Sequence, residues 1–269
     1  SMQHGAFHCL TKPFDNEELL QVVQRAWQAL VDRDEVVALR SELAKGESFH
    51  GIVSRDPRML NALTTVRKAG QTATTVLVYG ESGTGKELVA RAIHETSPRR
   101  DGPFVAFNAA AVSETLAEAE LFGAKRGAYT GADRDRKGLF VEADGGTLFI
   151  DEVSSMPSAL QGKLLRAIQE REVLPVGAGT PIDVDVRIVA ATNVEPKRLL
   201  SERLLRKDLY YRLAVVRVQL PPLRERAQDI PLLLEHFITK ISRKLGRTIT
   251  GAAPEFVEAM WRMLQQDEP

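Results

Sequence analysis

The sequence is poor in several features, and each absence excludes a class of protein. Cys9 is the one cysteine among 269 residues, so no disulfide can form within the chain, as fits a reducing compartment. No apolar run approaches the ~18 residues of a membrane span, and the N-terminus lacks the charged and apolar regions of a signal peptide. The sequence therefore favours a cytoplasmic protein with no membrane partner.

Charge of one sign is not in excess either. The 36 Lys and Arg residues balance the 36 Asp and Glu residues. This balance argues against binding nucleic acid or anionic lipid by bulk attraction, although a local basic patch remains allowed. What the sequence does have is a 43% share of hydrophobic residues, which is enough for an ordinary core in one or two domains.

The hydrophobic residues are arranged in a pattern that predicts the fold class. Between about residues 55 and 220, short runs rich in Val, Ile and Phe alternate with helical patterns. Near-continuous apolarity is typical of strands buried on both faces of a parallel sheet. The alternation predicts an α/β domain with a doubly wound, parallel, five-stranded sheet. The expected strands cover residues 75–79, 104–107, 147–151, 186–191 and 215–220.

Helical segments are expected on both sides of this domain. Asp15 with Glu18 forms a capping box that opens a helix. Val23, Leu30 and Val37 then lie seven residues apart, which fits a helix packed on its own domain and a dimerising coiled coil equally well. Residues 46–54 have the composition of a linker. After residue 222 the pattern is helical, with a helical stripe from 230 to 245 and a second helix expected over 254–264.

A glycine-rich segment follows the first expected strand and precedes an expected helix over 88–95. It matches the phosphate-binding P-loop pattern up to its last position, where Glu87 replaces Ser or Thr. The glycines let backbone N–H groups converge on phosphate oxygens, and Lys86 supplies a charge for the β- and γ-phosphates. The alternative is a glycine-rich turn with an incidental lysine, which the strand–loop–helix context disfavours. The segment consists of Gly80, Glu81, Ser82, Gly83, Thr84, Gly85, Lys86 and Glu87.

Polar residues end three of the expected strands. Asp151 and Glu152 end the strand 147–151 and have the form of a Walker B motif, in which Asp151 holds Mg²⁺ and Glu152 polarises the attacking water. Glu87 can also reach the metal, because Mg²⁺ prefers oxygen ligands. Two acids at a strand end are often merely solvated, but after a P-loop the pairing is specific. Asn108, Thr192 and Asn193 end two further strands, where they face a ligand crevice or simply terminate the strand.

These motifs together resemble a known family. The P-loop, the segment 145–152 and a small-residue loop over 127–132 are similar to the AAA+ core of sigma-54-dependent transcription activators, the NtrC-like family. The loop is the specific part, because it resembles the family's Gly-Ala-Phe-Thr-Gly-Ala motif with Tyr in place of Phe. A glycine-rich hairpin tip is its structural alternative. The loop consists of Gly127, Ala128, Tyr129, Thr130, Gly131 and Ala132.

The resemblance implies an ATPase that uses ATP and Mg²⁺ to remodel RNA polymerase carrying sigma-54. It implies that Tyr129 and Thr130 contact the sigma factor and that Asn108 restrains the catalytic glutamate and couples it to the loop. Thr192 and Asn193 resemble sensor I, which reads the γ-phosphate. Arg206 and Arg212 resemble paired arginines at the subunit edge that reach a neighbouring ATP, although most arginines on helices are simply surface residues. The family assembles as hexameric or heptameric rings and as dimers when inactive.

The resemblance also divides the chain into parts. Residues 1–30 resemble the C-terminal end of a response-regulator receiver domain, and 31–50 a helical linker. The ATPase domain is expected over 51–220, followed by an incomplete helical lid over 221–269. Trp261 is followed by Arg262 and Met263, so the family's sensor II motif is missing, as is the DNA-binding domain through which DNA would be contacted. Arg224 and Arg226 belong to an earlier stretch of the family pattern and are not substitutes for sensor II.

Two other functions compete with this interpretation. One is a different AAA+ machine, such as an unfoldase or helicase loader, which the loop over 127–132 argues against. The other is a regulator that binds nucleotide without hydrolysing it. The missing sensor II motif favours such a fragment, whereas the presence of Lys86, Asp151 and Glu152 argues for hydrolysis.

Overall fold

The computed structural model describes residues 39, 41, 48–128, 133–247, 249, 251–253, 255 and 256. The chain divides after Glu47 into two compact units, and all the elements named below belong to the second unit, Ser48–Pro269. The predicted receiver remnant over 1–30, most of the linker over 31–50 and nearly all of the helix expected over 254–264 lie outside the described residues.

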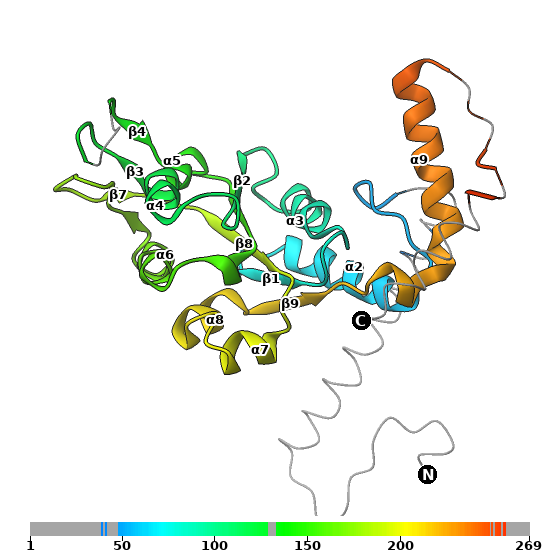
Figure 1. Ribbon diagram of the computed structural model, residues 1–269, viewed down its shortest axis with the longest axis horizontal. Coiled ribbons are helices and arrows are strands. Elements are labelled where there is room, and N and C mark those ends of the chain that lie inside the picture. The colour runs from blue at the N-terminus through cyan, green and yellow to red at the C-terminus, as the bar shows by residue number, and fades with distance from the viewer. Residues whose placement is uncertain are drawn as a thin grey trace, which may run out of the picture. The chain divides into compact units, whose positions relative to one another are not determined.

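A five-stranded parallel sheet forms the centre of the domain (Figure 1). Its strand order is β2-β5-β8-β1-β9, so the chain crosses over repeatedly between non-adjacent strands. The predicted parallel α/β sheet is therefore confirmed, and each strand begins and ends within one residue of its expected limits. The strands are β1 (Val76–Tyr79), β2 (Phe104–Asn108), β5 (Thr147–Asp151), β8 (Arg187–Thr192) and β9 (Val216–Gln219).

Burial on both faces explains why these runs form central strands. In β5, Leu148 and Ile150 belong to a large hydrophobic cluster on one face of the sheet. Phe149 lies between them, and its ring stacks on Phe104 of the neighbouring strand with ring centroids 6.2 Å apart. Successive side chains of a strand point to opposite faces, so an uninterrupted apolar run is what a sheet covered on both sides requires.

Helices cover the two faces of the sheet. Helix α2 begins after Asp56, whose carboxylate accepts the backbone N–H groups of Arg58 and Met59 as an N-cap. Helices α2 and α3 pack on each other and against the sheet, whereas α4, α5, α6 and α8 contribute to the cluster on the other face. The helices are α2 (Pro57–Gly70), α3 (Lys86–Glu95), α4 (Glu114–Phe122), α5 (Leu139–Glu142), α6 (Ser158–Glu170), α7 (Pro196–Ser201), α8 (Lys207–Leu213) and the 3-10 helix η2 (Val153–Ser155).

Two small hairpins project from one end of the domain (Figure 1). Strands β3 (Gly123–Ala124) and β4 (Arg136–Lys137) pair antiparallel, as do β6 (Glu172–Val173) and β7 (Ile182–Asp183). The hairpins are tied together because Lys125 N–H donates to the Val176 carbonyl and Val176 N–H donates to the Gly123 carbonyl, each at 2.9 Å. Strands β3 and β4 flank the expected 127–132 loop, so the hairpin expected as its structural alternative is present.

The chain leaves the sheet through a 3-10 helix, η3 (Leu223–Asp229), which leads into α9 (Ile230–Leu245). Asp229 is fully buried and connects this segment to the start of the domain. Its carboxylate accepts the Ser54 hydroxyl at 2.5 Å and the Arg55 backbone N–H at 2.7 Å. Within the described residues, none of the helices is both long enough and apolar enough to cross a membrane.

Candidate functional site

The candidate site lies at the edge of the sheet where the central strands end. Tyr79 of β1 pairs with Thr192 of β8, and Asn108 of β2 pairs with Asp151 of β5. Because these strands are parallel, their carboxyl ends meet at one edge, which is where α/β sheets bind ligands. The P-loop starts directly after Tyr79, so the topology brings the predicted P-loop, acid pair and polar strand ends together.

Glycine is required at three positions of the P-loop for two different reasons. At Gly80 a Cβ atom would lie 2.8 Å from the Leu220 carbonyl oxygen, so a side chain does not fit. Gly83 and Gly85 have φ angles of 78° and 98°, which L-residues with side chains rarely adopt. Helix α3 begins immediately afterwards at Lys86, and its first N–H groups have no partner within the helix. The loop and the helix start therefore form a cradle suited to an anion.

Lys86 occupies the centre of this cradle. Its side chain is 7% exposed, and Nζ donates to the carbonyl oxygens of Gly80 at 3.0 Å and Glu81 at 3.1 Å. Nζ also lies 3.8 Å from Oε1 of Glu152. The loop thus positions a nearly buried ammonium group beside Glu152, where it can donate charge-assisted hydrogen bonds to a phosphate group.

The acid pair has an unusual backbone. Asp151 ends β5, and its Oδ1 accepts the backbone N–H of Glu152 at 2.9 Å. Glu152 has φ 52° and ψ 45°, a left-handed conformation that is uncommon for a residue other than glycine. Such backbone strain concentrates at functional sites. Here it turns the Glu152 side chain, which is 17% exposed, towards Lys86.

The three polar residues at the other strand ends differ in their contacts. Asn108 is exposed, and its side-chain oxygen accepts the Ala110 N–H at 2.9 Å beside Asp151. Thr192 is fully buried; its carbonyl accepts the Gly80 N–H at 3.2 Å, and its hydroxyl lies 3.0 Å from the hydroxyl of Ser154. Asn193 is exposed, and its side chain makes no hydrogen bond within the described residues. Thr192 is therefore the residue that connects β8 to the P-loop.

Glu87, the expected second metal ligand, lies on the surface of α3. Its carboxylate accepts hydrogen bonds from Arg91 at 2.8 and 3.2 Å, and its side chain is 56% exposed. Among the described residues no contact joins Glu87 to Asp151. Arg91 therefore competes with a metal for the Glu87 carboxylate, through its Oε1 atom.

Two arginines that sequence reasoning did not assign to the site contact the P-loop. Arg224 forms a two-pronged ion pair with Glu81, with both N–O distances at 2.5 Å, and this pair holds the pKa of Glu81 below its usual range. Arg226 is 6% exposed and donates to the Thr84 carbonyl at 3.3 Å. Burial lowers its pKa. Two consecutive prolines follow β9, and they could have indicated that the chain turns back there towards the P-loop.

The paired arginines of α8 lie elsewhere. Arg206 precedes α8 and is held by Asp208, with N–O distances of 2.8 and 3.1 Å. The Arg212 carbonyl accepts the Thr75 hydroxyl at 2.6 Å, so Arg212 lies at the amino end of β1. The P-loop follows the carboxyl end of the same strand. The structure therefore places Arg212 at the opposite edge of the sheet from the P-loop of its own chain.

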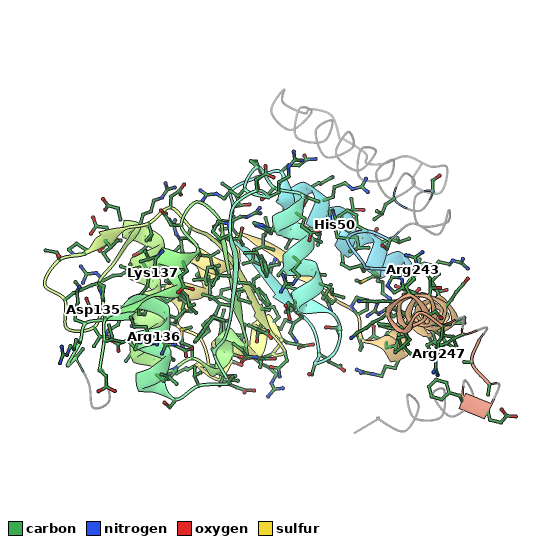
Figure 2. The ribbon with its side chains drawn as sticks, turned by 90° about the horizontal axis from the view of Figure 1, so that it is seen from above. His50, Asp135, Arg136, Lys137, Arg243 and Arg247 are labelled. Atoms are coloured by element: carbon green, nitrogen blue, oxygen red, sulfur yellow. The ribbon has the colours of Figure 1, made fainter. Side chains whose placement is uncertain are left out.

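Only the first part of the expected partner-binding loop is described. Gly127 has a φ angle of 78°, and the Cα and side chain of Ala128 lie close to Gly177 of the second hairpin. Residues 129–132, which include Tyr129 and Thr130, lie outside the described part. The far side of the loop is anchored by Asp135, which accepts the Arg126 N–H at 2.9 Å and the Lys125 ammonium at 2.7 Å. Figure 2 shows Asp135, Arg136 and Lys137 at the end of the domain far from Arg243.

The residues present fit a triphosphate with Mg²⁺. The left-handed glycines, the free start of α3 and the buried Lys86 ammonium fit phosphate oxygens. Asp151 supplies one carboxylate at a strand end, and Mg²⁺ in phosphate sites uses one or two carboxylates together with phosphate oxygens and water. In the described ranges no group of three His, Cys, Asp or Glu residues could hold a metal by itself.

Comparisons with known proteins agree with this geometry. The NtrC transcriptional regulator of Azospirillum brasilense is 48% identical over 240 residues, which are 89% of this chain and 49% of NtrC. Regulatory protein AtoC of Escherichia coli is 45% identical over 254 residues, which are 94% of this chain and 55% of AtoC. The chain thus spans about half the length of the curated relatives it matches.

Solved structures and a family model give the same result. NtrX of Brucella abortus in complex with ADP has a TM-score of 0.70 and 35% identity, covering 95% of this chain and 54% of NtrX. The same protein in complex with ATP has a TM-score of 0.67 and 35% identity, covering 91% of this chain and 51% of NtrX. A model of the sigma-54 interaction domain matches residues 52–219, which is more than half of the chain. The chain therefore belongs to the sigma-54 interaction domain family.

Proposed function

We propose that this chain is an ATP-hydrolysing transcription activator that remodels the closed promoter complex of RNA polymerase carrying sigma-54, as part of a two-component response regulator. The observation that carries the proposal is the buried Lys86 ammonium, which lies within a glycine cradle and 3.8 Å from the Glu152 carboxylate. Membership of the sigma-54 interaction domain family gives this phosphate site its biological context. That NtrX of Brucella abortus was solved with ADP and with ATP supports the choice of nucleotide.

Each residue at the carboxyl edge of the sheet has a role in this proposal. The P-loop N–H groups, from Gly80 to Glu87, and Lys86 bind the β- and γ-phosphates. Asp151 would hold Mg²⁺, with Glu87 as a second oxygen ligand, and the metal would neutralise phosphate charge. Glu152 accepts a proton from the attacking water. Asn108 restrains Glu152, while Thr192 and Asn193 sense the γ-phosphate.

The proposal requires neighbouring copies of the chain. Arg212 lies at the amino end of β1, whereas its own P-loop follows the carboxyl end. An arginine in that place is too far from its own P-loop to contact a nucleotide bound there. We therefore infer that Arg212 and Arg206 act across the interface of a ring of six or seven copies, with dimers as the inactive state. An arginine supplied in trans contributes about 10³–10⁵ to turnover in other nucleotide hydrolases.

The partner-binding role falls to residues 127–132. Asn108 pairs in register with Asp151, and helix α4 then leads from this edge of the sheet to the hairpin that carries the loop. A change at the γ-phosphate therefore has a short covalent route to the loop, in which Tyr129 and Thr130 would contact sigma-54. DNA contact would come from a domain outside this chain. The proposed division is a receiver remnant over 1–30, a linker over 31–50, the ATPase domain over 51–220 and a lid over 221–269.

Two measurements test this function together. The ATPase activity of the chain should disappear in Glu152→Ala, since that variant loses the proton acceptor. Sigma-54 should be captured by the chain in the presence of a transition-state phosphate mimic and released without it. If the wild type and Glu152→Ala both bind ATP without hydrolysing it, the chain is instead a regulator that binds nucleotide without turnover. Turnover without any capture of sigma-54 would indicate another AAA+ machine.

A further inference from the structure

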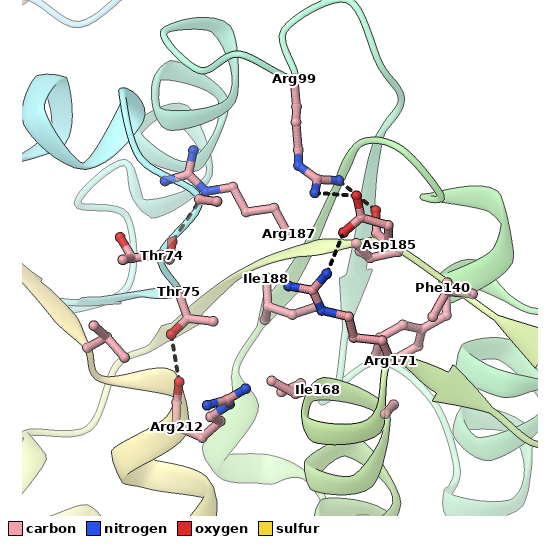
Figure 3. A pocket seen from close by; sticks show the side chains of 15 residues that line it. Thr74, Thr75, Arg99, Phe140, Ile168, Arg171, Asp185, Arg187, Ile188 and Arg212 are labelled. Atoms are coloured by element: carbon pink, nitrogen blue, oxygen red, sulfur yellow. Dashed lines mark hydrogen bonds and ion pairs between the residues drawn. The ribbon is translucent and has the colours of Figure 1, made fainter.

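A cavity of about 250 Å³ lies at the amino edge of the sheet, opposite the nucleotide site (Figure 3). It is lined by residues that precede or begin β1 and β8, including Thr74, Thr75 and Arg187. Four arginines and a single carboxylate line this cavity, namely Arg99, Arg171, Arg187, Arg212 and Asp185. We call this group the amino-edge arginine cluster.

The positive charge of the cluster is not balanced by its own partners. Arg187 is 3% exposed and donates to the carbonyl oxygens of Ala69 at 2.6 Å and Gly70 at 3.2 Å, which satisfy its hydrogen bonds but do not cancel its charge. Burial lowers the pKa of Arg187 to about 10, so it remains charged at neutral pH. Asp185 is the one acid in the cavity lining, and Arg99 already binds it at 2.7 Å. The cavity therefore presents a net positive charge to any incoming anion.

Arg171 is placed in the cluster at a conformational cost. It caps the end of α6 with φ 57° and ψ 32°, the left-handed conformation for which helix ends normally use glycine. A residue held in this region is a pointer to function. Its guanidinium is 3.7 Å from Asp185, a carboxylate that Arg99 holds much more closely, and its side chain is 75% exposed. The ion pair between Arg171 and Asp185 is therefore weak.

Arg212 is the second uncommitted cation. Within the described residues its guanidinium makes no hydrogen bond or ion pair, and only its backbone carbonyl is engaged, by Thr75. Figure 3 shows the Arg171 and Arg212 side chains extending on either side of Ile168 in the same cavity. Two cations therefore share this cavity, one of them held only by the 3.7 Å contact to Asp185 and the other with no carboxylate partner within the described residues.

We propose that Arg171 acts beside Arg212 as a second trans-acting cation, and that the cavity receives the terminal phosphates of a nucleotide held by a neighbouring copy of the chain. This inference rests on the proposed ring ATPase. The four residues of β1 separate the cavity from the P-loop of the same chain, a distance of roughly 13 Å along the strand. A phosphate bound to the chain's own P-loop therefore lies too far away for Arg171 to contact it.

Asp185 is the resting counter-ion in this arrangement. While the neighbour is absent, the carboxylate holds Arg171 weakly and Arg99 firmly. A terminal phosphate carries more negative charge than one carboxylate and attracts the looser guanidinium first. Arg99 keeps Asp185 neutralised when Arg171 leaves it. No covalent step is involved, because Arg171 only stabilises charge on the phosphate oxygens.

Arg171→Gly separates this role from a structural one. Glycine suits the left-handed backbone, so the variant should melt at the same temperature as the wild type or higher. Its ATPase activity should nevertheless fall about tenfold, a smaller loss than a principal arginine finger gives. Arg166→Ala is the matched control, because Arg166 is a 77% exposed arginine of the same helix that pairs with Glu170 outside the cavity. This control should retain wild-type activity.

Mixed assemblies determine whether Arg171 acts in trans. Glu152→Gln subunits are added in increasing excess to Arg171→Gly and, separately, to wild type. The added subunits cannot hydrolyse ATP but carry an intact Arg171. The activity of Arg171→Gly relative to wild type should rise from about one tenth towards one, because both proteins then receive Arg171 from the added subunit.

Three outcomes overturn the inference. Wild-type activity in Arg171→Gly excludes any role in turnover. If the activity of Arg171→Gly relative to wild type stays near one tenth in the mixtures, Arg171 acts within its own chain. That result would fit a cavity that binds free phosphate. A lower melting temperature of Arg171→Gly, together with equal losses of ATPase activity in Arg171→Gly and Arg166→Ala, indicates a structural effect. If the wild type itself shows no ATPase activity that depends on Glu152, then the proposed function has failed instead.

Discussion

The Lys86 ammonium and the Glu152 carboxylate lie 3.8 Å apart, and this contact joins the P-loop to the acid pair. A bound phosphate would draw Lys86 away from Glu152 and leave that carboxylate free to accept a proton. Glu152→Gln should therefore bind ATP at least as tightly as wild type, since it removes a negative charge from the phosphate site. Turnover should fall by about 10²–10⁴, the usual contribution of a general base. Calorimetric ATP binding and steady-state hydrolysis measure the two effects, and a parallel loss of both would contradict the assignment.

The ion pair between Glu81 and Arg224 gives a second prediction. Arg224 neutralises a carboxylate that lies within the P-loop. In Arg224→Gln the uncompensated Glu81 should repel phosphate and weaken ATP binding several-fold. The stability of the fold should change by less than about 1 kcal/mol, because the pair is exposed.

The double variant Glu81→Gln with Arg224→Gln is the control. It removes both charges and should recover most of the lost affinity, as a double-mutant cycle would reveal. Equal affinity losses in the single and double variants would mean that Arg224 acts on the nucleotide site by another route.

The central strands could be predicted from sequence because one physical signal dominates them. Leu148, Phe149 and Ile150 are all buried, so both faces of β5 are apolar and the run stands out from its surroundings. The carboxyl edge followed from the same signal, since a P-loop and an acid pair that end parallel strands must meet. Short elements without such a signal were not predicted. The strands β3 and β6 contain only Gly123–Ala124 and Glu172–Val173.

Ion pairs between residues far apart in the chain could not be predicted from the sequence either. Arg224 and Glu81 are 143 positions apart, and nothing local in either segment indicates the other. Glu87 illustrates the opposite problem. Its place in the motif predicts a metal ligand, but its i,i+4 neighbour Arg91 offers the carboxylate a nearer partner. Only the folded arrangement decides between such alternatives.

His94 provides a test of stability against pH. It is 5% exposed, its ring lies 3.0 Å from the Thr147 hydroxyl, and burial lowers its pKa below the ordinary value of 6.5. As pH falls through 6.5, the unfolded chain binds a proton that the folded chain does not yet bind. The free energy of unfolding should therefore decrease between pH 7.5 and pH 5.5, a range of about one unit on each side of the reference histidine pKa. Urea unfolding at the two pH values measures this decrease.

His94→Gln should reduce this pH dependence, because it removes the titrating group. His236→Gln, which changes a half-buried histidine of α9, should preserve it. If His94→Gln shows the same decrease as wild type, another group causes the pH dependence.

Alanine substitutions at two glycines should change the stability of the domain in opposite directions. A Cβ atom at Gly146 would lie 2.0 Å from the Pro103 carbonyl oxygen at the start of β5. Gly146→Ala should therefore cost about 1–3 kcal/mol of unfolding free energy, as expected for overpacking. Gly162 lies within helix α6, where an added Cβ meets only the flexible Arg206 guanidinium at 3.5 Å.

Gly162→Ala should stabilise the domain by up to about 1 kcal/mol through helix propensity. Chemical unfolding of both variants measures the difference. Similar stabilities for Gly146→Ala and Gly162→Ala would contradict the described packing at the amino end of β5.

The dependence of ATPase activity on protein concentration tests most directly whether the hydrolytic site is shared between copies. Arg212 and the P-loop lie at opposite edges of one sheet, so the proposed mechanism requires a neighbouring copy to supply Arg212. Activity per chain should rise steeply with concentration as rings form, and Arg212→Ala should remain nearly inactive throughout. A constant activity per chain over a range in which sedimentation shows only monomers would contradict the account.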